Sequence, residues 1–308
     1  MLLFPNLNKN MQFKTLDIKE KVLLKNYCSF KIGGEADFFV EIKQKNQISA
    51  VFTLAQEKKI PLLFIGSGSN ILFSDKGFRG IIVKMSNKGI KKNNNQLSVA
   101  AGEEISNFLL ETAKMGIDFS DLAGIPGNIG GSIFGNAGAQ NSAIFDFLES
   151  VEIFDQENFK ILPKKSISFG YRFANFPKNS VIFSANFKNF PKNKPEKILE
   201  KIKKNIFLRQ EKNPRGFSVG SFFRNPSSQI FAGKLIEESN CKELKIGDAQ
   251  VAEKHANWII NKKNASAEEV IILAKKIVEK VYQKSKIYLQ PEVKIFDEFG
   301  KKIALKKT

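Results

Sequence analysis

GIPGNIGGSIFGNAGA, residues 124–139, is the stretch that decides the fold. It places six glycines within fifteen residues, with the apolar Ile125 and Ile129 between them. Flexible linkers are polar, so this loop is expected to pack against something. Close approach of the backbone to a flat or phosphorylated ligand accounts for the composition, and a tight crossing of two chain segments is the alternative.

A second glycine-rich turn, GSGSN at residues 66–70, directly follows an apolar strand at 62–65. Glycine lets backbone N–H groups turn toward a phosphate, and the serines add hydroxyl donors. The turn is not the G-x-G-x-x-G fingerprint, because no amphipathic helix follows it. Alone it indicates an ordinary strand-to-loop turn. Two such loops in one chain favour a large dinucleotide cofactor.

Around these loops, short apolar strands alternate with helices. Helices are expected at 48–57, 105–115, 196–209 and 229–238, and strands at 38–42, 62–65, 80–84, 97–101, 149–155, 159–162, 181–187, 244–251, 257–261, 287–289 and 293–296. A further helix is expected after Ser266, which forms a capping box with Glu269. The polar stretch 91–96 is expected to be a turn between subdomains. The pattern is typical of an α+β fold.

Changes in composition divide the chain into parts. We expect an N-terminal extension at 1–17, two subdomains at 18–86 and 87–195, and a smaller α+β domain at 196–303. The stretch 187–197, with two prolines among Lys and Asn, marks the last boundary.

The charge and the rare residue types exclude several function classes. The net charge is +18, but the lysines are spread through the chain and their densest runs lack interleaved aromatics for base stacking. Solvated lysines, or a field that attracts small anions, are favoured over nucleic-acid binding. One histidine and two cysteines make neither a metal site nor a disulfide framework. No stretch is long enough for a membrane helix and no signal peptide is evident, so a cytoplasmic protein is expected.

Nine motifs in order carry a resemblance to a known family. They are NYCSFKIGGEAD (26–37), GSGSN (66–70), GIPGNIGG (124–131), NAGA (136–139), YR (171–172), GSFFRNP (220–226), AGKLI (232–236), EKHAN (253–257) and PEV (291–293). In this order they resemble the UDP-N-acetylenolpyruvoylglucosamine reductases (MurB), over about residues 18–296. The short interval between Arg172 and Ser221 resembles the compact form, which lacks an extra tyrosine-bearing loop. Phe134-Gly135, Val219 and Gln290 depart from the family pattern.

The resemblance implies a fold and a reaction. The fold is an FAD-binding domain of two α+β subdomains followed by a substrate domain. The reaction is the reduction of UDP-N-acetylglucosamine enolpyruvate to UDP-N-acetylmuramate for peptidoglycan synthesis, with FAD as cofactor and NADPH as co-substrate. A monomer that neither binds nucleic acid nor inserts into a membrane is expected.

The resemblance also implies roles for individual residues. Ser221 is the expected proton donor, and Arg172 and Glu292 assist at the developing enolate. The FAD-binding residues are expected to be Gly66, Ser67, Gly68, Ser69, Asn70, Gly124, Ile125, Pro126, Gly130, Gly131, Asn136, Ala137 and Gly138. Lys212 and Asn225 are expected to bind the UDP-sugar, with Tyr171 and His255 as further candidates.

Plainer interpretations exist for the same residues. A serine beside glycine is commonly a turn hydroxyl, and a lone histidine is commonly structural. Whether Glu292 is protonated or orients Arg172 is left open. Another FAD-linked oxidase or dehydrogenase of the same cofactor-binding fold is the first alternative function, and a basic nucleic-acid-binding protein is the second.

Overall fold

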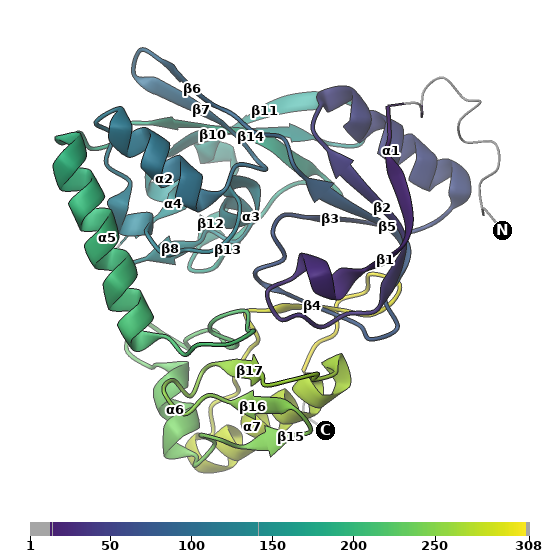
Figure 1. Cartoon of the computed structure of the whole chain (residues 1–308), viewed down its shortest axis with the longest axis vertical. Helices are drawn as coiled ribbons and strands as arrows, with labels where there is room; N and C mark the ends of the chain where they lie inside the picture. The colour runs from purple at the N-terminus through teal and green to yellow at the C-terminus, as the bar shows by residue number, and fades with distance from the viewer. Residues whose placement is uncertain (1–12, 14, 141, 306–308) are drawn as a thin grey trace. The chain divides into compact units, whose positions relative to one another are not determined.

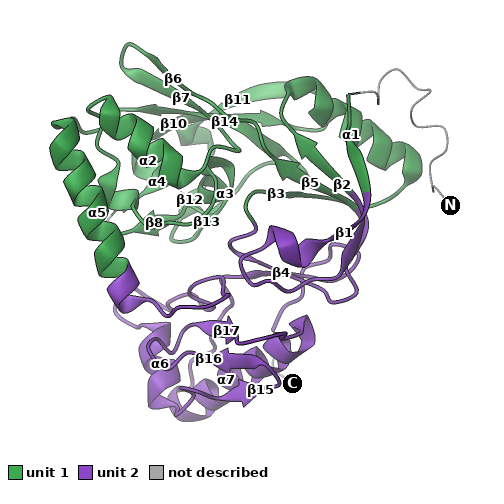
Figure 2. Cartoon of the chain, viewed as in Figure 1, with its two compact units in different colours: residues 1–19, 39–67, 81–209 green, residues 20–38, 68–80, 210–308 purple. Residues whose placement is uncertain are grey.

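The computed structural model describes residues 13, 15–140 and 142–305, so most of the expected extension at 1–17 lies outside the described residues. The chain divides into two compact units (Figure 2). Unit 1 comprises residues 1–19, 39–67 and 81–209, and unit 2 comprises residues 20–38, 68–80 and 210–308. The boundary falls within β1 (Ile18–Leu23), β2 (Glu35–Ile42) and β5 (Phe78–Met85), three strands of a sheet ordered β1-β2-β5-β3.

Unit 1 is built on a five-stranded sheet ordered β11-β10-β14-β7-β6, whose neighbouring strands all run antiparallel (Figure 1). The strands are β6 (Ile90–Asn93), β7 (Gln96–Ala100), β10 (Leu148–Phe154), β11 (Phe159–Pro163) and β14 (Val181–Lys188). The helices of this part are α2 (Ile105–Lys114), α3 (Ile129–Phe134), α4 (Ile144–Phe147) and α5 (Pro195–Lys212), with 3-10 turns η4 (Ser120–Leu122) and η5 (Lys164–Ser166).

Phenylalanine fills the core beneath this sheet. Phe108, Phe119 and Phe187 are almost fully buried, with ring centroids 4.7–5.9 Å apart in tilted or edge contacts. Aromatic rings in such arrangements combine a large buried area with favourable quadrupole contacts. The high phenylalanine content therefore serves packing in this part of the chain.

The rest of unit 1 holds α1 (Lys45–Lys58) and β3 (Leu62–Ile65), and β3 pairs in parallel with β5 from Leu62↔Ile81 onward. Small two-residue strands form two antiparallel hairpins near the glycine-rich loop. They are β8 (Gly138–Ala139) with β9 (Ser142–Ala143), and β12 (Phe169–Gly170) with β13 (Phe173–Ala174).

Unit 2 combines a three-stranded antiparallel sheet with two helices (Figure 1). Its elements are η3 (Leu24–Tyr27), β4 (Ile71–Phe73), α6 (Ala232–Glu238), β15 (Lys245–Ile246), β16 (Ala249–Val251), β17 (Ile259–Asn261), α7 (Ala267–Ser285) and β18 (Lys294–Phe296). The last strand pairs in parallel with β4. The capping box of α7 is confirmed, because Ser266 Oγ accepts from Glu269 N at 3.0 Å and Glu269 Oε2 accepts from Ser266 N at 3.1 Å.

The α+β class is confirmed, whereas several element predictions are wrong. The turn predicted at 91–96 is present only at residues 94–95. Residues 91–93 belong to β6, a strand at the edge of the sheet that pairs through its backbone and needs no apolar side chains. Residues 287–289 form no strand, although Leu289 is buried, since burial patterns do not reveal whether a pairing partner exists. The expected strand at 244–251 is a hairpin of β15 and β16, turned at Gly247 with φ +54°.

Two helical predictions also need correction. The short helix α3 lies within the stretch expected to be a loop, and α6 begins at Ala232 rather than near Gln229. Among residues 13, 15–140 and 142–305, no helix is both long and apolar enough to cross a membrane.

Candidate functional site

The residues predicted to form the site are divided between the two units. Unit 1 holds Gly66, Ser67, the loop 124–138, Tyr171 and Arg172. Unit 2 holds Gly68, Ser69, Asn70, Lys212, Ser221, Asn225, His255 and Glu292. Each unit therefore holds part of the predicted site, and the two parts are described separately.

In unit 1, Asn128 connects the two glycine-rich segments. Ser67 Oγ donates a hydrogen bond to Asn128 Oδ1. Asn128 Nδ2 in turn donates to Gly102 O at 2.7 Å. A Cβ on Gly66 would lie only 2.9 Å from Asn128 Oδ1, so the first turn approaches the second loop as closely as glycine permits.

The second loop is packed, as its alternation of glycine with apolar residues predicts. Ile129 is fully buried and Ile125 packs on the same core. A Cβ on Gly130 would lie 2.9 Å from Ala101 Cβ, whereas a Cβ on Gly131 would meet no heavy atom within 4 Å. The two neighbouring glycines thus have different surroundings. Gly130 packs closely against Ala101, whereas Gly131 has open space beside it.

Arg172 lies at the turn between β12 and β13, with φ +60°. Its Nη1 donates to Gly138 O at 3.1 Å, and its guanidinium lies 5.4 Å from the centroid of the exposed Tyr171 ring. Asn136 Nδ2 donates to Gly170 O at 2.9 Å. These two hydrogen bonds attach the hairpin with Tyr171 and Arg172 to the NAGA segment of the glycine-rich loop.

In unit 2, backbone hydrogen bonds hold the segments of Ser221 and Glu292 side by side. Glu292 N donates to Phe222 O at 2.8 Å, and Phe222 N donates to Asn257 O at 2.8 Å. The Asn257 side chain brackets Phe223, donating to its carbonyl at 2.8 Å and accepting from its N–H at 2.9 Å. Buried amides satisfied in this way hold a backbone rigidly. The predicted proton donor and the predicted carboxylate thus come from adjacent, well-fixed segments.

The end of the GSGSN turn reaches the same region of unit 2. Asn70 Nδ2 donates to Glu292 O at 3.3 Å, and Lys294 N donates to Asn70 O at 3.0 Å. Gly68 adopts φ +65°, and a Cβ there would lie 2.1 Å from Tyr27 O. Glycine is therefore required at Gly68 by both its dihedral angle and its neighbour.

Two cations of this region were not predicted from the sequence. Arg224 Nε is buried and has no hydrogen-bond partner in the part of the chain that the structure describes. Burial lowers the pKa of Lys294, and the positive charges of Arg224 and Lys302 lower it further, while Glu292 acts in the opposite direction. Arg224 stands inside the GSFFRNP motif and Lys294 two residues after Glu292. The sequence shows both residues next to predicted site residues, but no local sequence pattern indicates that a lysine or arginine side chain is buried away from water.

The predicted sugar-binding residues differ in their surroundings. Lys212, the last residue of α5, is exposed. Asn225 Oδ1 accepts from Ala232 N at 3.0 Å at the start of α6, so this side chain also has a structural role. His255 Nδ1 accepts from Asn257 N at 3.2 Å, and burial lowers its pKa. Both features favour a neutral imidazole.

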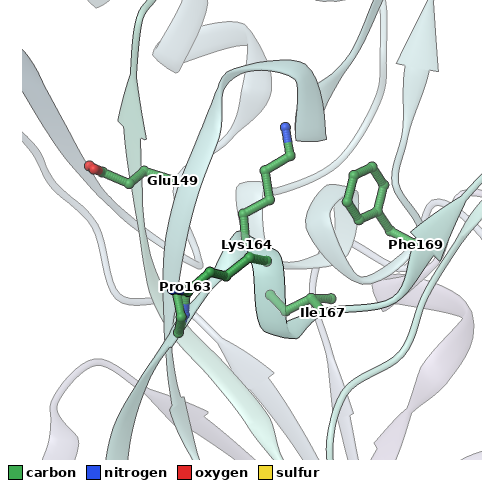
Figure 3. Close-up of a pocket in the computed structure, with 6 residues that line it drawn as sticks. Glu149, Pro163, Lys164, Ile167 and Phe169 are labelled. Atoms are coloured by element: carbon green, nitrogen blue, oxygen red, sulfur yellow. The ribbon is translucent and has the colours of Figure 1, made fainter.

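An open cavity of about 480 Å³ lies elsewhere in unit 1 (Figure 3). It is lined by Glu149, Pro163, Lys164, Lys165, Ile167 and Phe169. Lys164 Nζ lies 5.4 Å from the centroid of the Phe169 ring. None of the predicted site residues lines this cavity, so it is not part of the candidate site. No cluster of three or more His, Cys, Asp or Glu suited to a metal occurs among the described residues.

Comparison with known proteins matches both parts of the chain to described families. Residues 36–158 match a family described as "FAD binding domain". Residues 211–296 match "UDP-N-acetylenolpyruvoylglucosamine reductase, C-terminal domain". The first match contains both glycine-rich loops, and the second contains Ser221 and Glu292.

Individual relatives cover nearly the whole chain. The UDP-N-acetylenolpyruvoylglucosamine reductase of Desulforamulus reducens is 36% identical over 89% of this chain and 92% of its own length. That of Clostridium kluyveri is 36% identical over 92% of this chain and 94% of its own length. The crystal structure of the Thermus caldophilus UDP-N-acetylenolpyruvylglucosamine reductase (MurB) superposes with a TM-score of 0.78 at 27% identity, covering 91% of this chain and 99% of that one. The chain belongs to the family of UDP-N-acetylenolpyruvoylglucosamine reductases.

Proposed function

We propose that Ser221, Glu292 and Arg172 carry out the reduction of UDP-N-acetylglucosamine enolpyruvate in this FAD-dependent reductase, with NADPH as the source of electrons. The reaction yields UDP-N-acetylmuramate for peptidoglycan synthesis. The observation that carries this assignment is the pairing of the Ser221 and Glu292 segments, where Glu292 N donates to Phe222 O at 2.8 Å. Two groups able to hold a proton thus come from adjacent, hydrogen-bonded segments.

The residues of unit 1 fit a dinucleotide cofactor. The space beside Gly131 would be filled by a Cβ, and Gly66 approaches Asn128 too closely for a larger residue. Ser67 and Asn128 supply polar atoms between the two loops. These residues, with Gly124, Ile125, Pro126, Gly130, Asn136, Ala137 and Gly138, are proposed to hold FAD in unit 1. Gly68, Ser69 and Asn70 are proposed to contribute from unit 2.

FAD supplies hydride transfer from NADPH to the enolpyruvyl group. The chain's own residues then have to deliver one proton to the adjacent carbon and stabilise the negative charge that develops on the carboxylate side. We assign the proton to the Ser221 hydroxyl. Arg172 is assigned to neutralise the charge on the enolate oxygens, since a guanidinium offers two parallel donors to a carboxylate.

Glu292 is assigned to support the same proton transfer. Its backbone is held at both sides, by Glu292 N donating to Phe222 and by Asn70 Nδ2 donating to its carbonyl. Glu292 and Lys294 lie close enough for their opposite charges to attract each other.

Lys212 and Asn225 are proposed to bind the UDP-sugar, with Tyr171 and His255 at its margin. A neutral His255 that accepts from Asn257 N stabilises the bracket around Phe223. His255 is therefore proposed to act through the position of that segment. We further propose that the protein is a cytoplasmic monomer that binds no nucleic acid, and that its positive charge attracts anionic substrates.

Separate half-reactions test the role of Ser221. Ser221→Ala should permit NADPH to bleach the flavin absorbance at the wild-type rate, because hydride transfer to FAD needs no proton from Ser221. Reoxidation by UDP-N-acetylglucosamine enolpyruvate should be slowed by about 10²- to 10⁴-fold, the range for loss of a general acid. Ser49→Ala is the control, since it removes a hydroxyl from an exposed position of α1. Wild-type reoxidation in Ser221→Ala would remove Ser221 from this role.

A further inference from the structure

Arg209 is a cation near the end of α5 that the reaction described above does not use. Lys201, Asn205 and Arg209 are spaced four residues apart, so they share one face of the helix. Lys201 Nζ lies 3.0 Å from Asp121 Oδ1, and Asn205 Nδ2 donates to Ser120 O at 2.9 Å. This face of α5 therefore lies along the segment that leads into the glycine-rich loop.

One turn after Asn205, the Arg209 side chain lies against Gly124, the first residue of that loop. A Cβ on Gly124 would lie 2.5 Å from Arg209 Cδ and 2.9 Å from its Nε. Gly124 also has φ +80°. Glycine at this position thus accommodates the turn and leaves room for the guanidinium stem. The close contact places the charge of Arg209 at the loop.

The electrostatic environment of Arg209 is unfavourable in the protein alone. Burial lowers its pKa, and the neighbouring guanidinium of Arg172 lowers it further. Arg209 is half-buried and forms no hydrogen bond or ion pair within residues 13, 15–140 and 142–305. A cation near a helix C-terminus interacts favourably with the helix dipole. That interaction does not explain why Arg209 lies on Gly124 and close to Arg172.

The positive charges of Arg172 and Arg209 repel each other across this partly buried region. Arg172 is attached to the far end of the same loop, because its Nη1 donates to Gly138 O at 3.1 Å. The loop from Gly124 to Gly138 is therefore flanked by a cation at each end. A ligand with anionic oxygens held at this loop would relieve the repulsion.

We propose that Arg209 is a second ligand-binding arginine, which acts with Arg172 on the anionic oxygens of the ligand held at the Gly124–Gly138 loop. The inference rests on the proposed function, because that function supplies the ligand. The anion is either the diphosphate of FAD or a charged group of the UDP-sugar substrate. Both present oxygen atoms that a guanidinium binds through paired hydrogen bonds.

Variants at Arg209 test whether this arginine binds the ligand, and they distinguish FAD from the UDP-sugar as the source of the anion. Arg209→Met keeps the apolar stem and removes the charge, and Arg209→Lys keeps a charge without the planar fork. Lys203→Met is the matched control, since it removes one charge from an exposed position of the same helix. FAD affinity is measured on the apoprotein by flavin fluorescence. Affinity for UDP-N-acetylglucosamine enolpyruvate is measured on the FAD-loaded protein from the change in its flavin spectrum.

Arg209→Met should weaken one of these two affinities by about 10- to 100-fold, as expected for loss of a charge-assisted hydrogen bond. The affinity of Arg209→Lys should lie between those of Arg209→Met and the wild type, and the affinity of Lys203→Met should equal that of the wild type. Weaker FAD binding identifies the cofactor as the source of the anion. Unchanged FAD binding with weaker substrate binding identifies the substrate.

Wild-type values for both affinities in Arg209→Met would overturn the inference. If Arg209→Met does not fold, the Arg209→Lys protein provides the test. Wild-type affinities for FAD and substrate in Arg209→Lys would mean that Arg209 has a purely structural role, and would also overturn the inference. A wild-type protein that binds no FAD would instead contradict the proposed function, so the two failures are distinguishable.

Discussion

Gly130 and Gly131 are adjacent residues of one short helix with opposite surroundings, and they offer a test of the cofactor site. Replacing glycine by alanine inside a helix stabilises it by about 0.5–1 kcal/mol when there is room. A Cβ at Gly131 meets nothing, but one at Gly130 would lie 2.9 Å from Ala101 Cβ. Gly131→Ala should therefore keep or raise the free energy of unfolding, yet weaken FAD binding by filling the proposed site.

Gly130→Ala provides the contrast. It should lower the free energy of unfolding, because the added methyl must displace Ala101 in a buried position. Thermal unfolding of both apoproteins and FAD titration by fluorescence measure the two effects. Normal FAD affinity in Gly131→Ala would show that no ligand occupies the space beside that residue.

His255 should make the stability of unit 2 depend on pH. Its pKa is lowered from the ordinary value of 6.5 by burial, so the unfolded chain binds a proton more readily than the folded one. Stability is then full above the unfolded pKa and decreases as the pH falls from there to the folded pKa. Trp258, the only tryptophan, lies near His255 with ring centroids 6.4 Å apart and reports on this region.

Urea unfolding is followed by Trp258 fluorescence. In the wild-type protein, the urea concentration at the midpoint should decrease as the pH is lowered from about 7 to about 5. His255→Gln should reduce that pH dependence, because the titrating group is absent. Equal pH slopes in the two proteins would show that other groups control the acid response.

At the scale of an element, α7 depends on the interactions at its first turn. Ser266 and Glu269 satisfy each other's backbone N–H groups, and Asp75 accepts from Ala267 N at 2.8 Å within the same unit. Removing an N-cap hydroxyl costs about 1 kcal/mol. Ser266→Ala should therefore lower the free energy of unfolding of unit 2 by about that amount.

Ser266→Thr is the control for α7, since threonine retains an N-cap hydroxyl. Urea unfolding followed by Trp258 fluorescence measures both variants. A Ser266→Ala protein as stable as the wild type would mean that Asp75 alone is sufficient to cap the helix.

The helices and strands show which elements local patterns can predict. α7 could be placed because its apolar stripe and its cap lie within one stretch of chain. The turn predicted at 91–96 was too long, because the polar residues 91–93 belong to β6, which only the pairing Ile90↔Val99 through Asn93↔Gln96 makes a strand. An exposed edge strand depends on its neighbour rather than on its own composition.

At the scale of the whole molecule, the net charge of +18 should affect how fast anionic ligands are captured. NADPH and the UDP-sugar are both polyanions. Raising the ionic strength from about 0.02 to 0.2 M shortens the Debye length to less than 10 Å and screens this attraction. The kcat/KM for each substrate should fall several-fold over that range, while kcat at saturation should change little.

Measurements of kcat/KM against salt concentration test this directly, with a neutral crowding agent as the control for viscosity. A duplex DNA competitor at physiological salt should leave the rate unchanged if the lysines serve as a solvated, substrate-attracting surface. Rates independent of salt would show that the charge has no part in substrate capture.

The sequence by itself determined the α+β class, the order of the family motifs and the two glycine-rich loops, because each depends on residues close together in the chain. It also placed Ser221 and Glu292 in motifs of their own. Only the tertiary structure decided that Asn128 bonds to Ser67, that Asn257 brackets Phe223, and that Arg209 lies on Gly124. These contacts join residues 34 to 85 positions apart. Residue type and local spacing say nothing of such contacts, because burial and the distance between charges arise only when the chain is folded.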